Sequence, residues 1–202
     1  MDPERLEEVF ARVRGAYELL WGGQEAVEMD LGSRPELDEI HAAAVESDEF
    51  RALLTGGRRL VVVDLGAGRG SRLARHLAAA SPLLVAVDCF PSFVRLELAC
   101  PGRKVLSDAF RCGLAAGRAD LVISAYLSLR NSLFRDSGTG TAYVGEVLRL
   151  LRPGGLFWGE EPGLAPADFA GRPEVEDYFF LEGYSIHTFR RAGPPADFPQ
   201  VR

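Results

Sequence analysis

The sequence predicts an α/β fold, a doubly wound and mostly parallel sheet with helices on both faces and a helical extension at the N-terminus. Short apolar runs rich in β-branched residues recur along the chain and alternate with segments of helical periodicity. A glycine-rich turn follows the first of these runs directly, where a buried parallel strand would pass into a helix. Both observations are typical of open α/β sheets, which bind ligands beyond the carboxyl ends of their strands.

Two segments with apolar side chains at helical spacing precede the expected sheet. Residues 4–20 have apolar side chains at steps of three and four, which predicts an amphipathic helix, and a second stripe covers residues 37–50. We interpret residues 1–57 as a helical extension or lid of a single overall domain. Tyr17 and Trp21 would then either pack in the core or face a ligand.

The sheet is expected between residues 58 and 193, ahead of a frayed proline-rich tail over residues 194–202. Its continuous apolar runs predict strands that are buried on both faces. The predicted strands span 60–63, 83–87, 104–106, 121–124 and 156–158, and the clearest predicted helices span 71–80, 91–99 and 139–151.

The last part of the sheet has two interpretations. Residues 178–181 and 184–190 would form an antiparallel hairpin joined by Glu182 and Gly183, or residues 174–182 would form a helix. We favour the hairpin, because residues 184–190 alternate like a strand.

Composition excludes several classes of protein. Of 202 residues, 47% are hydrophobic and 26% charged, and no apolar run approaches the roughly 18 to 20 residues of a membrane span. A net charge of −6 argues against a nucleic acid partner, since phosphate binding depends on clustered cations. The charged N-terminus does not resemble a signal peptide, so we expect a cytoplasmic protein. Cys89, Cys100 and Cys112 fit neither a zinc pattern nor a disulfide framework.

The glycine-rich turn carries the clearest chemical signal. Gly66, Gly68 and Gly70 have the spacing G-x-G-x-G, whereas a dinucleotide fingerprint needs glycine at the position of Ser71. Asp64, two residues before the first glycine, would repel a pyrophosphate and suits a cation such as a sulfonium or an amino group. The alternative is a strand-to-helix turn without a ligand.

A second acidic residue, Asp88, ends the strand expected beside this turn. Its carboxylate would accept two hydrogen bonds from the vicinal hydroxyls of a ribose, although it also precedes Pro91 and Ser92 as a helix N-cap would. Cys89 would lie against an adenine. Asp108, after the third strand, would accept from the exocyclic amine or act as a turn residue.

In order and spacing these residues resemble the class I S-adenosylmethionine-dependent methyltransferase family. The resemblance covers about residues 58–160 and rests on the glycine motif, on Asp88, on Asp108-Ala109 and on the loop before the fifth strand at 151–155, Leu-Arg-Pro-Gly-Gly. It implies a Rossmann-like sheet that binds S-adenosylmethionine and releases S-adenosylhomocysteine.

The resemblance also implies roles for single residues. Asp64 and the turn backbone would hold the methionine end, Asp88 the ribose and Asp108 the adenine, while residues 124–126 would line the methyl-transfer site. With Cys89 included, the expected cofactor residues are Asp64, Gly66, Ala67, Gly68, Gly70, Asp88, Cys89, Asp108, Ala109 and Ser124.

Three residues are the candidates for catalysis, Tyr126, Glu161 and His187. Methyl transfer from a sulfonium needs alignment, and it needs a base when the nucleophile is a hydroxyl or an acidic carbon. Strand alternation allows only one of Glu160 and Glu161 to face a pocket. His187 is either a base or a surface histidine of the last strand.

The expected function is methyl transfer from S-adenosylmethionine to a small molecule, with N-, O- and C-methylation all open. The chain reads Ser-Ala-Tyr-Leu at 124–127, without the Asn- or Asp-Pro-Pro of nucleic-acid-modifying members and without the Asp and Asp-Asn pair of metal-dependent catechol methylating members. We therefore expect no metal. His41 and His76, on predicted helices, are weaker catalytic candidates.

Two other functions remain open. The chain would be a non-catalytic S-adenosylmethionine-binding protein or accessory subunit, or an aminopropyl transferase, although the paired Asp residues of the latter are absent after the fourth strand. The N-terminal helices would either cover the pocket or form the surface of a homodimer. The segment 17–23 weakly resembles the lid of glycine- and sarcosine-type N-methylating members.

Overall fold

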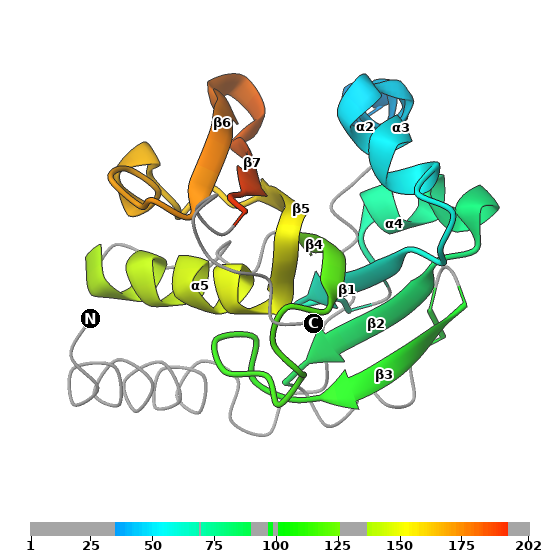
Figure 1. Cartoon of the computed structure of the whole chain (residues 1–202), viewed down its shortest axis with the longest axis horizontal. Coiled ribbons are helices and arrows are strands. Elements are labelled where there is room, and N and C mark those ends of the chain that lie inside the picture. Colours follow the sequence, from blue (N-terminus) through cyan, green and yellow to red (C-terminus); the bar gives the residue numbers. More distant parts are fainter. Residues whose placement is uncertain (1–34, 69, 90–96, 99–100, 126–136, 194–202) are drawn as a thin grey trace.

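The computed structural model describes residues 35–68, 70–89, 97–98, 101–125 and 137–193 (Figure 1). It confirms the predicted fold class, because seven strands form one sheet in the order β3-β2-β1-β4-β5-β7-β6. The strands are β1 Val61–Leu65, β2 Leu83–Asp88, β3 Gly102–Leu106, β4 Ala119–Ala125, β5 Leu151–Glu160, β6 Val175–Leu181 and β7 Ile186–Arg191. The helices are α2 Pro35–Glu46, α3 Asp48–Leu54, α4 Arg72–His76 and α5 Ser137–Leu150, with short 3-10 turns η1 Ala78–Ala80, η3 Pro166–Asp168 and η4 Glu182–Tyr184.

Strands β1 to β5 are parallel, and β7 is antiparallel to both of its neighbours, β5 and β6. The chain starts in the middle of the sheet at β1, runs outward to β3 and returns to β4 on the other side of β1. The strand order therefore reverses between β1 and β4, which is the position where open α/β sheets bind ligands.

Two hydrophobic cores lie on opposite faces of the sheet, because successive side chains of a strand point to opposite sides. One core packs against α5 and the other against α2, α3 and α4, as the arrangement of helices in Figure 1 shows. Val63, Val122 and Phe157 belong to the first core, and their neighbours Val62, Leu121 and Trp158 belong to the second. Burial on both faces explains why these strands are apolar without a break.

Two predicted helices are shorter than expected. The stripe over residues 37–50 is divided at Ser47, which caps α3 by accepting a hydrogen bond from the Phe50 amide at 3.4 Å. The helix predicted over residues 71–80 ends at His76 and continues as the 3-10 turn η1, which a left-handed Ser81 terminates at φ 46°.

The segment 151–155, expected as a loop before the fifth strand, lies within β5. Leu151 pairs with Ala119, and the register then shifts before Leu121 pairs with Leu156. A Cβ on Gly155 would lie 2.9 Å from the Arg152 carbonyl oxygen, so glycine is needed where the chain folds back on itself. Local glycines thus produce a bulge rather than a connection between elements.

The antiparallel hairpin at the end of the sheet is confirmed, and the alternative helix over residues 174–182 is wrong. Leu181 pairs with Ile186 across the turn η4, where Ser185 adopts a left-handed conformation at φ 53°. The alternation of residues 184–190 also holds, because Ile186 joins the α4-side core and Phe189 the α5-side core.

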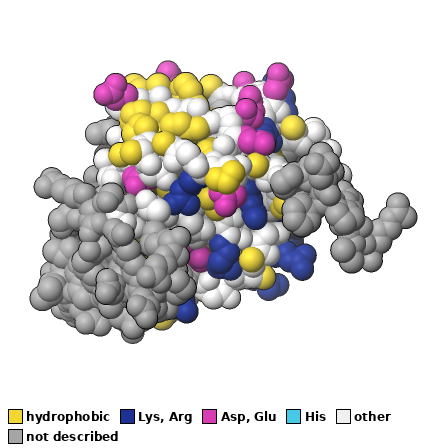
Figure 2. Space-filling model, turned by 60° about the vertical axis from the view of Figure 1, so that its left-hand side comes forward, with side chains coloured by type: hydrophobic (Ala, Val, Ile, Leu, Met, Phe, Trp, Pro, Cys, Tyr) yellow, Lys and Arg dark blue, Asp and Glu magenta, His cyan; other side chains and the backbone are white. Residues whose placement is uncertain are grey.

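β6 forms one outer edge of the sheet. Its Phe179 is 56% exposed, and Figure 2 shows hydrophobic side chains gathered on one face of the molecule among acidic and basic ones. The pairing with β7 is irregular between Glu176 and Phe179, where Asp177 has φ 51°. A bulged edge with exposed charges is a poor template for a further strand.

No helix in the part of the chain that the structure describes is long and apolar enough to cross a membrane. Several predictions lie outside the described residues: the first helix over residues 4–20 with Tyr17 and Trp21, the helix over 91–99 apart from residues 97 and 98, Cys100, Tyr126 and the tail from residue 194.

Candidate functional site

Polar side chains from neighbouring strands meet at the carboxyl edge of the sheet. Leu65 of β1 pairs with Val87 on one side and with Ser124 on the other, so the ends of β1, β2 and β4 are level. Asp88 follows Val87 and pairs with Leu106 of β3. The register therefore brings the predicted acids and Ser124 to the switch point of the sheet, as expected from the strand ends.

Asp64 is only 1% exposed, and its two carboxylate oxygens have different surroundings. Oδ2 accepts a hydrogen bond from the Ser71 amide at 2.8 Å, whereas Oδ1 is buried with no hydrogen-bond partner among the described residues. Burial raises the pKa of this carboxyl to about 7, the hydrogen bonds from Ser71 oppose the rise, and the charges of Asp88 and Glu160 add to it. No cation among the residues that the structure describes offsets this rise in the pKa.

The glycine turn connects Asp64 to Asp88. Gly66, Gly68 and Gly70 all have positive φ, at 68°, 49° and 104°, which explains why glycine occupies these positions. The Gly68 amide donates to Asp88 Oδ2 at 3.0 Å. The Asp88 carboxylate, 7% exposed, therefore lies against the turn rather than at the surface.

Ser71 is a site residue that the sequence reasoning missed. Its hydroxyl caps α4 by accepting from the Ala74 amide at 3.3 Å, while its own amide holds Asp64. A serine directly before a helical stripe is an N-cap signal, and it could have been found.

The residues expected at the adenine end lie beside Asp88. The Ser107 amide donates to the Asp88 carbonyl at 2.9 Å, which fixes the end of β3 against β2. Asp108 Oδ1 accepts from the Phe110 amide at 2.8 Å, a turn geometry, and Ala109 is buried in the α5-side core. Burial and the charges of Asp88 and Asp108 raise the pKa of the Cys89 thiol to about 12, so Cys89 is a neutral, unreactive side chain.

The adjacent Glu160 and Glu161 have different partners, and both are buried. Glu160 accepts from His41 Nε2 on α2 at 2.6 Å. Glu161 Oε1 accepts from the hydroxyl of Ser124, the last buried residue of β4. Glu161 is therefore hydrogen-bonded to a predicted cofactor residue, whereas Glu160 acts on Asp64 through its charge.

His187 is buried in the described structure, so its interpretation as a surface histidine is wrong. Its ring stacks on Phe180 at 4.4 Å and on Phe169 at 5.1 Å between centroids, and Nδ1 lies 2.9 Å from the Tyr178 hydroxyl. Burial lowers the pKa of His187 to about 4, so the imidazole is neutral near pH 7. Strand alternation alone could not predict this burial, because side chains from β6 and from the end of η3 cover the His187 ring.

The donors and acceptors at this edge fit a nucleoside that carries a cation. The buried, unpartnered oxygen of Asp64 is suited to an ammonium group, and Asp88 presents a carboxylate at the next strand end. No side chain fills the space at Gly68, where a Cβ would meet no heavy atom within 4 Å among the described residues. The arrangement does not suit a pyrophosphate, which two neighbouring carboxylates would repel.

Solved structures include proteins of similar fold. A candidate sarcosine dimethylglycine methyltransferase from Galdieria sulphuraria is 18% identical at a TM-score of 0.50, and the match covers 81% of this chain and 60% of that one. The N-methyltransferase NodS from Bradyrhizobium japonicum is 15% identical at a TM-score of 0.53, and the match covers 80% of this chain and 99% of that one. No family model and no curated protein matches the sequence. The chain has the class I methyltransferase fold.

Proposed function

We propose that this chain is an S-adenosylmethionine-dependent methyltransferase that acts on a small molecule. One observation carries the proposal: Asp64, the glycine turn and Asp88 meet at the switch point, with a buried carboxylate oxygen of Asp64 left unpartnered among the described residues. Similar folds in solved methyltransferases support the same chemistry.

The residues at the carboxyl edge would divide the cofactor among them. Asp64 would accept a hydrogen bond from the amino group of the methionine end. This cation would stabilise the ionised carboxylate, whose pKa burial raises. Asp88 would exchange the Gly68 amide for the ribose hydroxyls, or hold both through its two oxygens. Asp108 and Cys89 would border the adenine, with one Asp108 oxygen already bound to the Phe110 amide.

When bound, the cofactor would supply an electrophilic methyl group on a sulfonium. The chain would align the acceptor at the ends of β4 and β5 and receive the proton that the acceptor loses. Glu161 is the favoured base, because its carboxylate is hydrogen-bonded to Ser124 at this edge. Tyr126, two residues after Ser124, would border the same place and lies outside the described residues.

His187 is a weaker base in this proposal. A pKa of about 4 gives the neutral imidazole little affinity for a proton near pH 7. Its Nδ1 is also engaged by Tyr178, and aromatic rings cover it. We infer that His187 packs behind the site while Glu161 faces it.

Calorimetric titration with S-adenosylmethionine, S-adenosylhomocysteine and NAD in parallel tests the cofactor. We expect micromolar binding of both sulfur nucleosides and none of NAD, because the paired carboxylates disfavour a pyrophosphate. Binding of NAD alone, or of none of the three, would overturn the proposal.

A screen of amine, hydroxyl and carboxyl acceptors then tests turnover, with S-adenosylhomocysteine release as the readout. Glu161→Gln removes the base and leaves the Ser124 hydroxyl an acceptor, so we expect loss of turnover with cofactor affinity retained. Tight cofactor binding without turnover on any acceptor would favour the non-catalytic alternative instead.

A further inference from the structure

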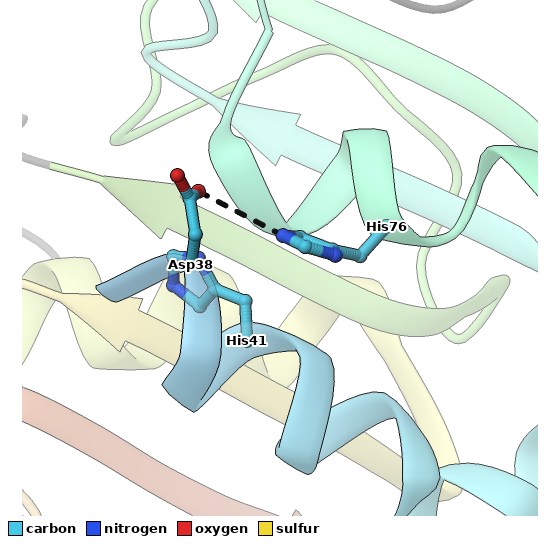
Figure 3. A group of neighbouring side chains, drawn as sticks. All are labelled: Asp38, His41 and His76. Atoms are coloured by element: carbon cyan, nitrogen blue, oxygen red, sulfur yellow. Dashed lines mark ion pairs between the residues drawn. The ribbon is translucent and has the colours of Figure 1, made fainter. Parts of the chain in front are cut away.

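Three side chains of the metal-ligating kind meet between α2 and α4. Asp38 and His41 are three residues apart on α2 and therefore share one helix face, and His76 lies near the end of α4. One ligand atom from each side chain lies within 4.8 Å of the other two. Figure 3 shows the Asp38 carboxylate and the His76 ring pointing toward each other across the two helices.

We propose that Asp38, His41 and His76 bind a divalent transition-metal ion of the zinc class, which ties the N-terminal extension to the sheet domain. Two imidazoles and one carboxylate form a common three-residue ligand set for zinc, with a fourth position left to water. Imidazole nitrogens favour zinc and its transition-metal neighbours over magnesium and calcium, which prefer oxygen ligands.

The burial of His41 is an independent reason to place a ligand here. Its side chain is 0% exposed, and Nε2 lies 2.6 Å from Glu160 Oε1. In the neutral tautomer whose Nε2 proton is donated to Glu160, Nδ1 is the free nitrogen. Nδ1 is buried with no hydrogen-bond partner among the described residues. A carboxylate behind a histidine ligand is the usual outer partner of a metal-bound imidazole, because it fixes the tautomer and the ring.

The distance between the Asp38 and His76 side chains suits a bridging ion better than a direct hydrogen bond. Asp38 Oδ1 and His76 Nε2 are 3.8 Å apart, too far for a hydrogen bond. Ligand atoms around tetrahedral zinc are about 3.4 Å apart, given zinc bonds of roughly 2.0 to 2.1 Å. The Asp38 side chain is 58% exposed and that of His76 is 30% exposed, so both can turn toward an ion held by the fixed His41 ring.

The proposed site is separate from the one for methyl transfer. Its ligands come from α2 and α4, whereas the metal pattern considered from the sequence concerned residues after β4. The site nevertheless lies near the cofactor turn, because α4 begins at Ser71, whose amide holds Asp64. An ion there would fix the extension against the helix that follows the glycine turn.

Metal binding to the full chain tests the proposal directly. The chain is treated with a chelator and dialysed, and zinc or cobalt(II) is then titrated. We expect one equivalent of zinc per chain, visible absorption bands of tetrahedral cobalt(II), and a rise in Tm of about 5 to 10 °C when free zinc is a hundredfold above Kd.

Asp38→Asn and His76→Asn each remove one ligand from a partly exposed position, so the fold should survive. Each variant should lose at least tenfold in zinc affinity and the cobalt bands. Glu39→Gln is the matched control, since it removes one charge from an exposed neighbour on the same helix. An unchanged zinc affinity in both ligand variants, an equal loss in Glu39→Gln, or no bound metal in the parent chain would overturn the site, whatever the cofactor titration shows.

Discussion

Buried carboxylates at the two edges of the parallel sheet have opposite surroundings. At the amino edge Asp120 is 2% exposed, accepts from the Val61 amide at 2.8 Å and pairs with Arg58 and Arg152. At the carboxyl edge Asp64 is 1% exposed, has one oxygen unpartnered among the described residues, and is flanked by further acids.

Under the proposed function, this difference separates a carboxylate that stabilises the fold from one that binds a ligand. Asp120 gains its hydrogen bonds and cations within the chain, so its burial is compensated. Among the described residues Asp64 has no such cation, and a perturbed buried acid in such a position is a common feature of functional sites. Substitutions at the two edges should therefore affect different properties.

The largest expected effect is on stability at the amino edge. Asp120→Ala removes an acceptor from the Val61 amide and leaves two arginines without their carboxylate, so the free energy of unfolding should fall by about 2 to 3 kcal/mol. The cost is moderated because the Arg58 side chain is 52% exposed. Urea unfolding measures it, with exposed Glu39→Ala as the control. A fall in the free energy of unfolding no larger than that of the control would show that the Asp120 ion pairs contribute nothing to stability.

At the carboxyl edge, Asp88→Ala should instead weaken cofactor binding. Loss of the ribose hydrogen bonds would reduce the binding free energy by roughly 1 to 3 kcal/mol, with little change in stability. Calorimetry on the variant and on exposed Asp48→Ala separates a specific effect from a general one. Unchanged affinity would remove Asp88 from the cofactor site.

Asp64→Asn sharpens the comparison because it preserves shape and removes only the charge. We expect about a tenfold loss of S-adenosylmethionine affinity, since a neutral amide attracts an ammonium group less strongly. The free energy of unfolding at pH 8 should be equal to that of the parent or higher, because an uncompensated buried charge is gone. A variant that is clearly less stable than the parent would mean that the Asp64 carboxylate stabilises the fold, as the Asp120 carboxylate does.

The last prediction concerns the pH dependence of this same carboxyl. Its folded-state pKa of about 7 lies above the ordinary value of 3.8, so its contribution to stability is present below about pH 4 and is lost as pH rises toward 7. Cofactor affinity should change in the other direction and weaken below about pH 7, where Asp64 takes up a proton. Both pH dependences should be reduced in Asp64→Asn, and an identical profile in parent and variant would contradict the assignment.

Much of the fold could be predicted because the strands are buried on both faces and are therefore apolar throughout. The runs at 121–124 and 156–158 lie within observed strands, and the run at 60–63 enters β1 at Val61. The misplaced boundaries have local causes that periodicity cannot detect: the cap at Ser47, the 3-10 turn after His76 and the glycine bulge at 151–155.

The sequence by itself determined which strands end in acids and where the glycine turn lies, since strand ends and turns are encoded by neighbouring residues. Only the tertiary structure decided that Glu160 binds His41, that Glu161 binds Ser124, and that aromatic rings enclose His187. These partners are far apart in the chain, and packing of separate elements brings them together. The spacing of residues along the chain predicts which way a side chain points. Its burial and its hydrogen-bond partners depend on the other elements that pack against it.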